Sequence, residues 1–459
     1  MTGFAVLPLS PPLAQAIDVL GFTQLTPVQE HALPPILAGK HVIAQARTGS
    51  GKTVAFGLGA LSLIDLSVRR VQALVLCPTR ELADQVSTEL RRFARFLPNL
   101  KVVTLCGGVP VRTQTPSLAH PVHMVVGTPG RILDHLRREN LELGGLRVLV
   151  LDEADRMLDM GFAESILAVV AQTPRQRQTL LFSATYPDAI RTMSHSVQRA
   201  PVEITVDATH SAEEIEQIFF EVDPACKLDA LTVLLAEHKP ESALVFCHTR
   251  NDVRDVAARL AARGFSVLAL HGELEQRERD EVLVRFSNRS AAVLVATDVA
   301  ARGLDIKGLP AVIAWELPTD PDVHVHRIGR TGRAGQRGLA LSLCAPGERK
   351  RAMAVLAQLG HQVRWGRLDL SAVAGLAKPS PAPMVTLMIE GGRQNKLRAG
   401  DLLGALTGDV GLAADDVGKI DIQPSRSYVA IRRQHAQRAL RCLRDGKIKG
   451  KRFRAWALA

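Results

Sequence analysis

Short runs of apolar, mostly β-branched residues recur along the chain. Each run is followed by a polar or glycine-containing loop and then by a helical pattern of apolar positions. This alternation predicts β and α units around a parallel sheet. The runs form two series, HVIAQA, ALVLC, RVLVL and TLLF in the first, and ALVFC, VLAL, AVLVA and AVIAW in the second. We therefore expect two parallel-sheet domains, each with its polar motifs at the carboxyl ends of the strands.

Two lapses in this pattern divide the chain. The polar stretch QRAPVEITVDATHSAEEIEQ indicates a join near residue 208, and DLSAVAGLAKPSPAP is typical of a linker that ends at Pro383. Beyond it the order becomes strand, helix, two strands, helix and strand, which predicts an α+β domain. The expected divisions are residues 1–207, 208–367, a linker at 368–383, and 384–459.

The basic charge of the chain is concentrated in its last part. Of the net charge of +11, the residues from Met384 onward supply 15 Lys and Arg against 7 Asp and Glu, or +8. Such an excess points to a polyanion, either nucleic acid or a membrane surface. No apolar run is long enough to cross a bilayer, and the N-terminus lacks the pattern of a signal peptide, so we expect a cytoplasmic protein.

The six cysteines are scattered without a C-x-x-C pair. This spacing argues against a structural zinc site and against a disulfide framework. Reduced, mostly buried thiols are the expected state.

The segment ARTGSGKT, from Ala46 to Thr53, lies between a strand-like run and an apolar helical pattern. This is the context of a P-loop, in which backbone N–H groups cradle phosphates, Lys52 neutralises the β and γ groups, and Thr53 binds Mg²⁺. Ala46 stands where the general pattern has glycine. The alternative, an ordinary glycine-rich turn, gives no reason for Lys-Thr at the start of a helix.

Asp152 and Glu153 directly follow the apolar run VLVL. A carboxylate at this place can hold Mg²⁺ through water, and its neighbour can orient and deprotonate an attacking water molecule. Acidic pairs after strands are also common as helix caps. The P-loop about a hundred residues upstream favours the catalytic interpretation.

The second series carries HRIGRTGRAG, from His326 to Gly335, with Arg330 and Arg333. Arginines at this spacing are usually a solvated helix face. Here they lie among glycines in a domain without a P-loop of its own, so we expect them to act as fingers on ATP bound by the other domain. Such an arginine is worth ~10³ to 10⁵ in rate.

The motifs GFTQLTPVQ, ARTGSGKT, PTREL, GG, TPGR, DEAD, SAT, ATDVAARGLD and HRIGRTGRAG follow one another over about residues 1 to 365. In this set the chain resembles the DEAD-box RNA helicases. The resemblance implies two RecA-like, doubly wound domains and RNA-stimulated hydrolysis of ATP with Mg²⁺. ATP and single-stranded RNA would bind across one interdomain cleft, and closure would bend the strand and open a few base pairs.

The resemblance also implies residue roles. Phe22 would stack on adenine, Gln29 would hydrogen-bond its edge, and Asp305 would contact the ribose. Phosphate-loop contacts would come from Ala46, Thr48, Gly49, Ser50, Gly51, Lys52 and Thr53, and coupling of hydrolysis to unwinding from Ser183, Thr185 and His326. The RNA-facing residues would be Pro78, Thr79, Arg80, Gly107, Gly108, Thr128, Gly130, Arg131, Gln276, Arg279, Thr297, Arg302 and Gly303. Outside the family context most of these would be turn glycines, helix caps and surface arginines, and Phe22 a core aromatic residue.

The last 75 or so residues are similar to the RRM-like extension of the bacterial DbpA subgroup of this family. If Val385, Leu387 and Ile389 face the core with Val429 and Ile431, the exposed sheet face carries Met388, Arg426 and Tyr428. A standard RRM stacks bases on two or three aromatic residues, and this face offers one. We therefore expect RNA on the basic strands and tail, with candidates Lys396, Arg398, Arg426, Tyr428, Arg432, Arg433, Lys447, Lys449, Lys451, Arg452 and Arg454.

The subgroup resemblance implies docking on a hairpin of 23S rRNA and a role in assembly of the 50S subunit, by a protein expected to be a monomer. Rival interpretations are an ATP-gated RNA clamp or general RNA chaperone, a DNA-directed helicase, and a C-terminal domain that is a nonspecific basic tether.

Overall fold

The computed structural model describes residues 3–46, 49–206, 215–301, 308–332, 338–359, 364–409 and 411–458. The chain divides into two compact units, the first from Met1 to His210 and the second taking in most of the chain from Ser211 onward. Several predicted site residues lie outside the described residues, namely Thr48, Arg302, Gly303, Asp305 and Arg333.

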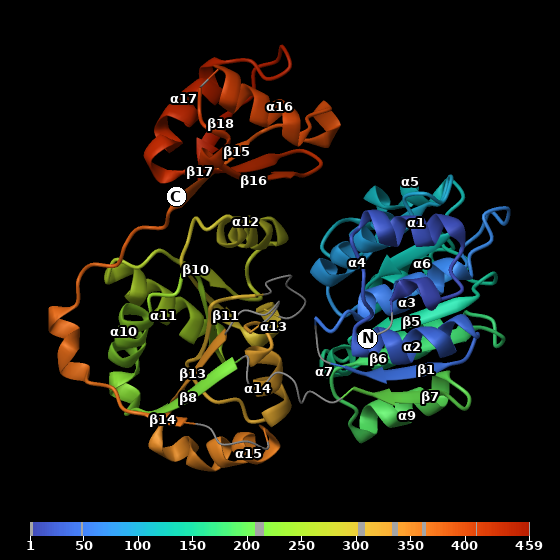
Figure 1. The fold of residues 1–459 in the computed structure, drawn as a ribbon, viewed down its shortest axis with the longest axis horizontal. Coiled ribbons are helices and arrows are strands. Elements are labelled where there is room, and N and C mark those ends of the chain that lie inside the picture. The colour runs from blue at the N-terminus through green and yellow to red at the C-terminus, as the bar shows by residue number, and fades with distance from the viewer. Residues whose placement is uncertain are drawn as a thin grey trace. The chain divides into compact units, whose positions relative to one another are not determined.

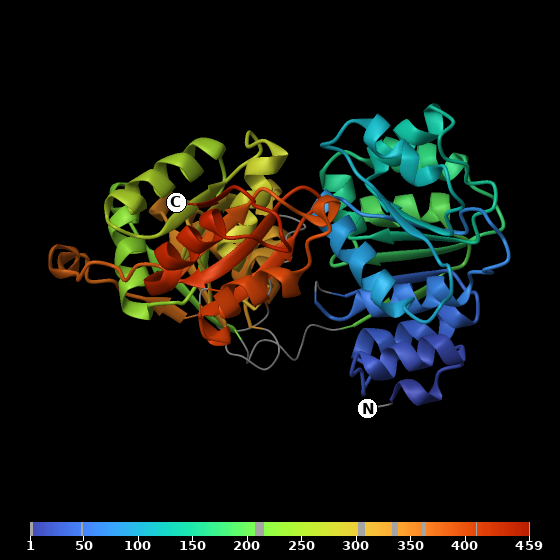
Figure 2. The same ribbon diagram turned by 90° about the horizontal axis from the view of Figure 1, so that it is seen from above.

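The first unit is built on a parallel sheet whose described strands run in the order β3-β4-β2-β5-β6-β1-β7. Their bounds are β1 Val42–Gln45, β2 Ala73–Leu76, β3 Val102–Leu105, β4 Met124–Gly127, β5 Val148–Asp152, β6 Gln178–Ser183 and β7 Val202–Thr205. Val42 and Ala44 belong to the core on one face of the sheet, and Ile43 to the core on the other. Because helices cover both faces (Figure 2), the strands are apolar throughout rather than alternating.

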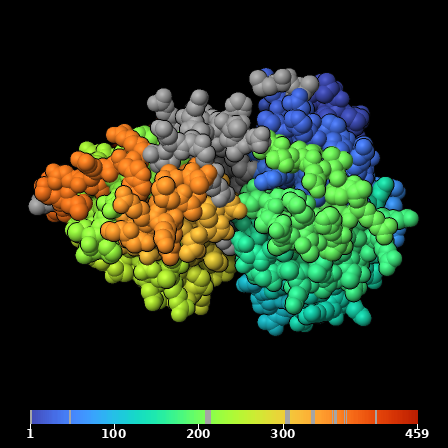
Figure 3. Space-filling model, turned by 90° about the horizontal axis from the view of Figure 1, so that it is seen from below, coloured from blue at the N-terminus to red at the C-terminus, as the bar shows by residue number. Residues whose placement is uncertain are grey.

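The helices of this unit begin where the sequence supplies caps. The Thr79 hydroxyl accepts a hydrogen bond from Leu82 N at the start of α4, and Thr26 with Gln29 forms a capping box at the start of α2. Helix bounds are α1 Pro11–Val19, α2 Pro27–Leu37, α3 Lys52–Ser62, α4 Arg80–Phe93, α5 Thr115–Leu118, α6 Pro129–Arg137, α7 Ala154–Asp159, α8 Ala163–Ala171 and α9 Asp188–Val197. Figure 3 shows the blue N-terminal part of the chain beside the green part that ends this unit, as the pairing of β1 with β7 requires.

The second unit contains another parallel sheet, with the described strands in the order β10-β11-β9-β12-β13-β8-β14. Helices α10 and α11 lie on one side of it and α13 and α14 on the other (Figure 1). Strand bounds are β8 Ile215–Glu221, β9 Ala243–Cys247, β10 Val267–Leu270, β11 Val293–Thr297, β12 Ala311–Ala314, β13 Gly338–Cys344 and β14 Arg364–Gly366. Helix bounds are α10 Lys227–His238, α11 Arg250–Ala262, α12 Gln276–Ser287, α13 Asp298–Ala301, α14 Pro321–Ile328 and α15 Arg349–Leu359.

The C-terminal part of this unit is an α+β domain with an antiparallel sheet in the order β16-β17-β15-β18. Its elements are β15 Met384–Ile389, α16 Ala399–Gly404, β16 Val417–Ile422, β17 Ser427–Arg432, α17 Ala436–Asp445 and β18 Ala455–Ala457. The predicted fold class, two RecA-like doubly wound parallel-sheet domains followed by an RRM-like α+β domain, is therefore confirmed.

The two faces of the C-terminal sheet have different environments. Leu387, Ile389, Val429 and Ile431 face the domain core, as predicted. The prediction that the opposite face is exposed is wrong, because Met388 and Tyr428 are each only 1% exposed. They pack against Val284 of α12, which belongs to the preceding parallel-sheet domain.

Polar contacts fix α12 and the residues after it against this sheet. Thr386, fully buried on β15, shares a 2.7 Å hydrogen bond with the hydroxyl of Ser290 and accepts one of 3.3 Å from Asn288 Nδ2. Arg426 Nη1 lies 3.0 Å from Glu281 Oε1. Buried polar groups paired in this way specify one register between the helix and the sheet.

Candidate nucleotide-binding and RNA-binding sites

The predicted phosphate loop connects β1 to α3. Gly51, the residue before α3, has φ 94°, and a Cβ there would lie 2.3 Å from the side-chain nitrogen of Gln29, so only glycine fits. Lys52 is buried at the start of α3, and its Nζ donates a 2.8 Å hydrogen bond to Ala46 O across the loop. The loop therefore has the bend, the helix N-terminus and the cation that a phosphate site needs.

The GFTQLTPVQ segment is attached to this loop. The Thr26 hydroxyl donates to Ser50 O at 2.7 Å, and Gln29 Nε2 donates to Gly51 O at 3.1 Å. The ring of Phe22 is half-buried between Phe4 and Phe93, with centroid distances of 6.1 and 6.2 Å. The contacts of Phe22 and Gln29 with adenine stay predictions, but the structure links the segment that would hold the base to the loop that would hold the phosphates.

Asp152 ends β5 and is 3% exposed. Burial raises the pKa of its carboxyl to about 7, against the opposing effect of the Lys52 ammonium. Among the described residues, its Oδ1 has no hydrogen-bond partner. A buried, unpaired carboxylate oxygen near the P-loop lysine fits a hard cation such as Mg²⁺, which prefers oxygen ligands. Thr53, next along α3, would supply the hydroxyl ligand.

No group of three or more His, Cys, Asp or Glu in the described part of the chain could hold a metal ion by itself. Mg²⁺ in proteins is usually held by one or two carboxylates together with water and substrate phosphates, a set to which Asp152 would contribute one carboxylate.

Glu153 has a left-handed backbone conformation, with φ 53° and ψ 53°. Its Oε2 accepts a 2.8 Å hydrogen bond from Arg156 Nη1, and both side chains are almost fully buried. A non-glycine residue in this conformation carries a backbone strain of roughly 1–3 kcal/mol, which the surrounding contacts must offset. The strain and the ion pair hold the Glu153 carboxylate in one place beside Asp152, as a residue that orients water must be held.

The predicted coupling residues Ser183 and Thr185 are connected to the DEAD segment through Asp155, which sequence reasoning did not single out. One carboxylate oxygen of Asp155 accepts hydrogen bonds from Ala184 N, Thr185 N and the Thr185 hydroxyl at 3.0 to 3.2 Å. The Ser183 hydroxyl accepts from Asp155 N at 3.2 Å. The end of β6 is thus bound directly to the segment that follows β5. Asp155 is the last residue of the DEAD motif, and the motif alone does not indicate this role.

The RNA-facing residues predicted in the first unit follow β2, β3 and β4, which are neighbours in the sheet. The carboxyl ends of parallel strands meet at one edge, so the structure brings these segments together. They contain Pro78, Thr79 and Arg80 after β2, Gly107 and Gly108 after β3, and Thr128, Gly130 and Arg131 after β4.

Gln114, which sequence reasoning missed, connects two of these segments. Arg131 Nη1 donates to Gln114 Oε1 at 2.8 Å, and Arg131 Nη2 donates to Val109 O, also at 2.8 Å. Gln114 Nε2 donates to Cys106 O at 2.9 Å, just before the two glycines. Arg131 was predicted to contact RNA. In this conformation its guanidinium group is instead hydrogen-bonded to the loop that contains the two glycines.

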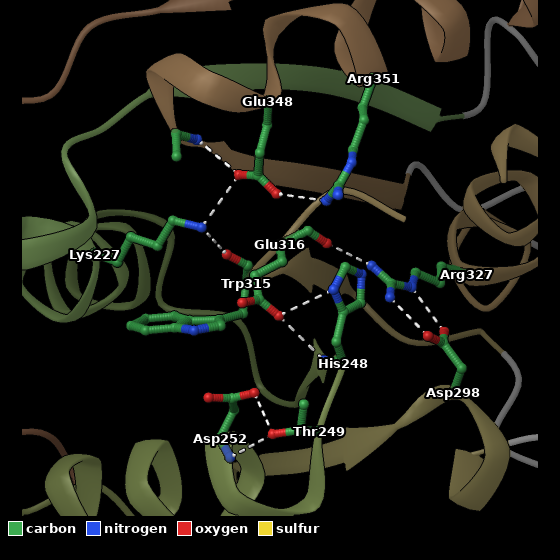
Figure 4. A network of polar contacts seen from close by, with 11 residues as sticks. Lys227, His248, Thr249, Asp252, Asp298, Trp315, Glu316, Arg327, Glu348 and Arg351 are labelled. Atoms are coloured by element: carbon green, nitrogen blue, oxygen red, sulfur yellow. Dashed lines mark hydrogen bonds and ion pairs between the residues drawn. The ribbon is translucent and has the colours of Figure 1, made fainter. Parts of the chain in front are cut away.

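In the second unit the polar residues after β9, β11 and β12 form the network in Figure 4. Arg327 makes two 2.7 Å hydrogen bonds to the carboxylate of Asp298 and a third of 2.7 Å to Glu316 O. His248 Nδ1 lies 3.3 Å from Glu316 Oε2. Arg327 and Asp298 belong to the motifs HRIGRTGRAG and ATDVAARGLD, so the bidentate pair joins these two motifs.

The predicted residues of this unit lie on α14 and the turn after it, on α12 and at the end of β11. His326 lies on α14, and Arg330, which is 4% exposed, lies in the turn after this helix. At the start of α12, Gln276 Nε2 donates to Asp280 Oδ1 at 2.9 Å and Arg279 Nη2 to Ala300 O at 3.4 Å. Thr297 ends β11 and its hydroxyl accepts from Ala300 N.

The predicted basic candidates in the C-terminal domain fall into two groups. Some are engaged within the unit: Arg426 with Glu281, Arg432 with Asp416, and Lys449 with Asp401. Arg433 donates to Ala382 O. The side chains of Lys396, Arg398, Lys447, Lys451, Arg452 and Arg454 are exposed.

Tyr428, a candidate for RNA contact from the sequence, is buried in the described conformation. Its ring is buried under α12, and burial, reinforced by the Glu281 carboxylate, raises the pKa of its hydroxyl. In the described conformation no base can reach it from the sheet face.

These features define a class of protein. A P-loop at the end of β1, a buried carboxylate pair at the end of β5, and a second parallel-sheet domain with a glycine-flanked arginine motif are those of a P-loop nucleoside triphosphatase of the helicase type.

Comparisons with known proteins specify the family. The model "DEAD/DEAH box helicase" matches residues 26–193, "Helicase conserved C-terminal domain" matches 226–335, and "DbpA RNA binding domain" matches 386–456. The chain is 54% identical over 456 residues to ATP-dependent RNA helicase DbpA of Escherichia coli K12, covering 99% of both chains. It is 45% identical over 349 residues to DEAD-box ATP-dependent RNA helicase CshA of Bacillus cereus, covering 76% of this chain and 66% of that protein.

Among solved structures, Saccharomyces cerevisiae Dbp5 bound to RNA and ADP BeF3 matches with a TM-score of 0.73 and 30% identity over 82% of this chain and 97% of that one. The chain belongs to the DEAD-box ATP-dependent RNA helicases, in the bacterial DbpA subgroup. In the described part of the chain, no helix is both long and apolar enough for a membrane span.

Proposed function

We propose that this RNA helicase remodels ribosomal RNA during assembly of the 50S subunit, anchored by residues 384–459 to a hairpin of 23S rRNA. The observation that carries the proposal is the match of residues 386–456 to a DbpA RNA binding domain, joined to a complete pair of helicase domains at 54% identity along the chain. The charge of +8 on the part from Met384 onward suits a structured polyanion. The protein would act in the cytoplasm as a monomer.

Most of the proposed hydrolytic roles belong to residues of the first unit. Lys52 and the backbone N–H groups of the loop bind the phosphates of ATP, and Thr53 and Asp152 would hold Mg²⁺, which would neutralise charge on the phosphates. Glu153 orients the attacking water and accepts its proton. Its pairing with Arg156 keeps that carboxylate fixed. Arg330, together with Arg333, stabilises the charge that develops in the transition state.

In this proposal Asp155 couples ATP hydrolysis to RNA unwinding. Loss of the γ-phosphate changes the surroundings of Asp152 and Glu153, and the hydrogen bonds of Asp155 to Ala184 and Thr185 pass that change to the segment after β6. If ATP and single-stranded RNA both favour the same closed state, each raises the affinity of the other.

The test is steady-state ATPase activity with a panel of 23S rRNA fragments, a nonribosomal RNA of equal length and the matching DNA strand. We expect stimulation by RNA, greatest with the fragment that contains the recognised hairpin, and none for Lys52→Ala. Deleting residues 384–459 should remove the preference among RNAs and leave a weaker, common response. Equal stimulation by all RNAs would favour the alternative, a general RNA chaperone or an ATP-gated clamp, and equal stimulation by DNA would refute RNA specificity.

A further inference from the structure

Gln114 lies where two RNA-facing segments of the first unit meet, although it belongs to none of the sequence motifs. One segment is the glycine loop with Gly107 and Gly108, which follows β3. The other contains Arg131 and follows the neighbouring strand β4. The inference below rests on the proposed function, and in particular on the prediction that these segments bind the RNA strand.

Two partners of opposite type fix the orientation of the Gln114 amide. Its Oε1 accepts a 2.8 Å hydrogen bond from Arg131 Nη1, and a guanidinium group can only donate. Its Nε2 donates a 2.9 Å hydrogen bond to Cys106 O, and a carbonyl can only accept. The side chain therefore bridges the end of β3 and the first turn of α6 in one orientation.

His135, one turn further along α6, makes a third contact with the same amide. It is fully buried, and its Nε2 lies 3.2 Å from Gln114 Oε1. Burial, together with the neighbouring Arg131 cation, lowers the pKa of this imidazole, so the ring is neutral. Because Oε1 only accepts, the proton lies on Nε2 and Nδ1 carries none. This agrees with the lack of a hydrogen-bond partner for Nδ1 among the described residues.

Arg131 is largely enclosed by these contacts. Its Nη2 donates a 2.8 Å hydrogen bond to Val109 O, its Nε lies 3.9 Å from Asp134 Oδ2, and its side chain is 11% exposed. An arginine that binds RNA presents two nitrogens side by side to a phosphate, but here both Nη atoms already donate to the protein. Arg80 differs, because its Nη1 has no hydrogen-bond partner in the part of the chain that the structure describes. Of the two arginines, Arg80 has the unused donor.

The glycine loop itself presents backbone to a ligand. Gly108 has φ 80°, a conformation that favours glycine, and a Cβ on Gly107 would meet nothing within 4 Å. Residues without side chains need their neighbours to hold them in one shape. The carbonyls of Cys106 and Val109, which accept from Gln114 and Arg131, lie directly before and after the glycine pair.

We propose that Gln114 and Arg131 are positioning residues for RNA binding by the first unit. They hold the glycine loop in one shape, and the strand contacts the backbone of this loop instead of the Arg131 guanidinium group. A preformed loop loses less conformational freedom when the strand binds, so the affinity for RNA is higher. This gives Gln114 a role and replaces the direct RNA contact predicted for Arg131.

The test measures binding of the full chain to a short, labelled oligouridylate with and without ADP and beryllium fluoride, the combination present in the RNA-bound Dbp5 structure. The affinity gained with nucleotide reports on the helicase domains, which contain the predicted nucleotide site. Gln114→Met and Arg131→Met should each weaken RNA binding in the presence of nucleotide at least ~10-fold, the value of one hydrogen bond to a charged group. The double variant should be no weaker than the single variants, within about twofold.

Two further readouts separate positioning from direct contact. Arg131→Lys keeps the charge but cannot bridge Gln114 and Val109 with a planar fork, so it should bind RNA as weakly as Arg131→Met. The slope of log affinity against log salt should stay unchanged in Gln114→Met and Arg131→Met. Arg80→Met, in which a phosphate contact would be lost, should lower that slope by about 0.7.

The matched control is Arg137→Met, which removes an exposed cation from the last turn of α6 and should change neither affinity nor slope. A slope lowered by about 0.7 in Arg131→Met, or nearly wild-type affinity in Gln114→Met or Arg131→Lys, would refute the positioning role. Loss of ADP affinity in Gln114→Met would also refute it, because the effect would then extend to the phosphate loop. If the wild type gains no affinity with nucleotide, or if Arg80→Met changes nothing, the RNA site on which the inference rests is itself refuted.

Discussion

Replacing Asp152 by Asn should stabilise the nucleotide-free protein in a way that depends on pH. The folded pKa of this carboxyl is about 7, raised by burial, while an unfolded aspartate has a pKa of about 3.9. The folded state therefore binds the proton more tightly. The contribution of Asp152 to the free energy of unfolding is greatest at low pH and falls as the pH rises through the folded pKa. Integrated from about pH 5 to about pH 8, the loss is about 3 kcal/mol.

The side-chain amide of the Asp152→Asn variant cannot titrate, so the variant should escape this loss. Any cost of leaving that amide unpaired is the same at both pH values and cancels. For a domain of this size, 1 kcal/mol shifts the melting temperature by about 2–4 °C, so the gain of Asp152→Asn over wild type should be about 6–12 °C larger near pH 8 than near pH 5. Saturating Mg²⁺ and ADP should abolish the difference, because a bound cation favours the ionised carboxylate.

Two optical signals separate the units. All three tryptophans, Trp315, Trp365 and Trp456, lie in the second unit, so their fluorescence should show a transition that the substitution leaves in place. Circular dichroism records both units and should show the shift. Glu203→Gln, an exposed carboxylate lost from β7, is the control. If Asp152→Asn and wild type have parallel melting temperatures at both pH values, the assignment of a buried, raised pKa to Asp152 is incorrect.

Further expectations concern coupling, docking and catalysis. Thr185→Val removes the 3.1 Å hydrogen bond to Asp155 and should lower duplex unwinding at least ~10-fold, since one hydrogen bond to a charged group is worth about 1.5–3 kcal/mol. RNA-stimulated ATPase activity should stay within a few fold of wild type. Equal loss of both activities would contradict a coupling role. A double-mutant cycle with Glu281→Gln and Arg426→Met should give a coupling energy of about 1 kcal/mol in urea unfolding followed by tryptophan fluorescence, and a value near zero would show that the half-buried pair does not contribute. Arg330→Ala should reduce RNA-stimulated ATPase about 10³-fold or more with little change in the KM for ATP, whereas a rise in KM alone would assign Arg330 to binding.

The parallel-sheet domains could be predicted because their strands are apolar on both faces, which a run such as VLVL displays directly. The sites after those strands could be predicted because chemistry requires Lys52, Asp152 and Glu153 where no packing need explains them. Internal partners could not be predicted in this way. Gln29 bonds to Gly51 and Arg131 to Gln114, and nothing in a motif tells how far along the chain a side chain will find its hydrogen bond.

The covered face of the C-terminal sheet has a signature in the sequence. Met388, Tyr428 and Trp456 are all apolar or aromatic, so this face resembles a second core rather than a solvated surface. Alternation along a strand separates the two faces but does not say what packs on either. The partner is α12, about a hundred residues upstream, and only the folded chain brings the two together.

Helix α12 serves two purposes at once. Gln276 and Arg279 at its beginning are predicted to face RNA, while Glu281 and Val284 further along contact the C-terminal domain. That domain is consequently not an interchangeable module. A chimera that grafts residues 384–459 onto another helicase would need to import the matching side of this helix as well. Otherwise the grafted domain would not be fixed in place, and the apolar surfaces of both the sheet and the helix would be exposed to solvent.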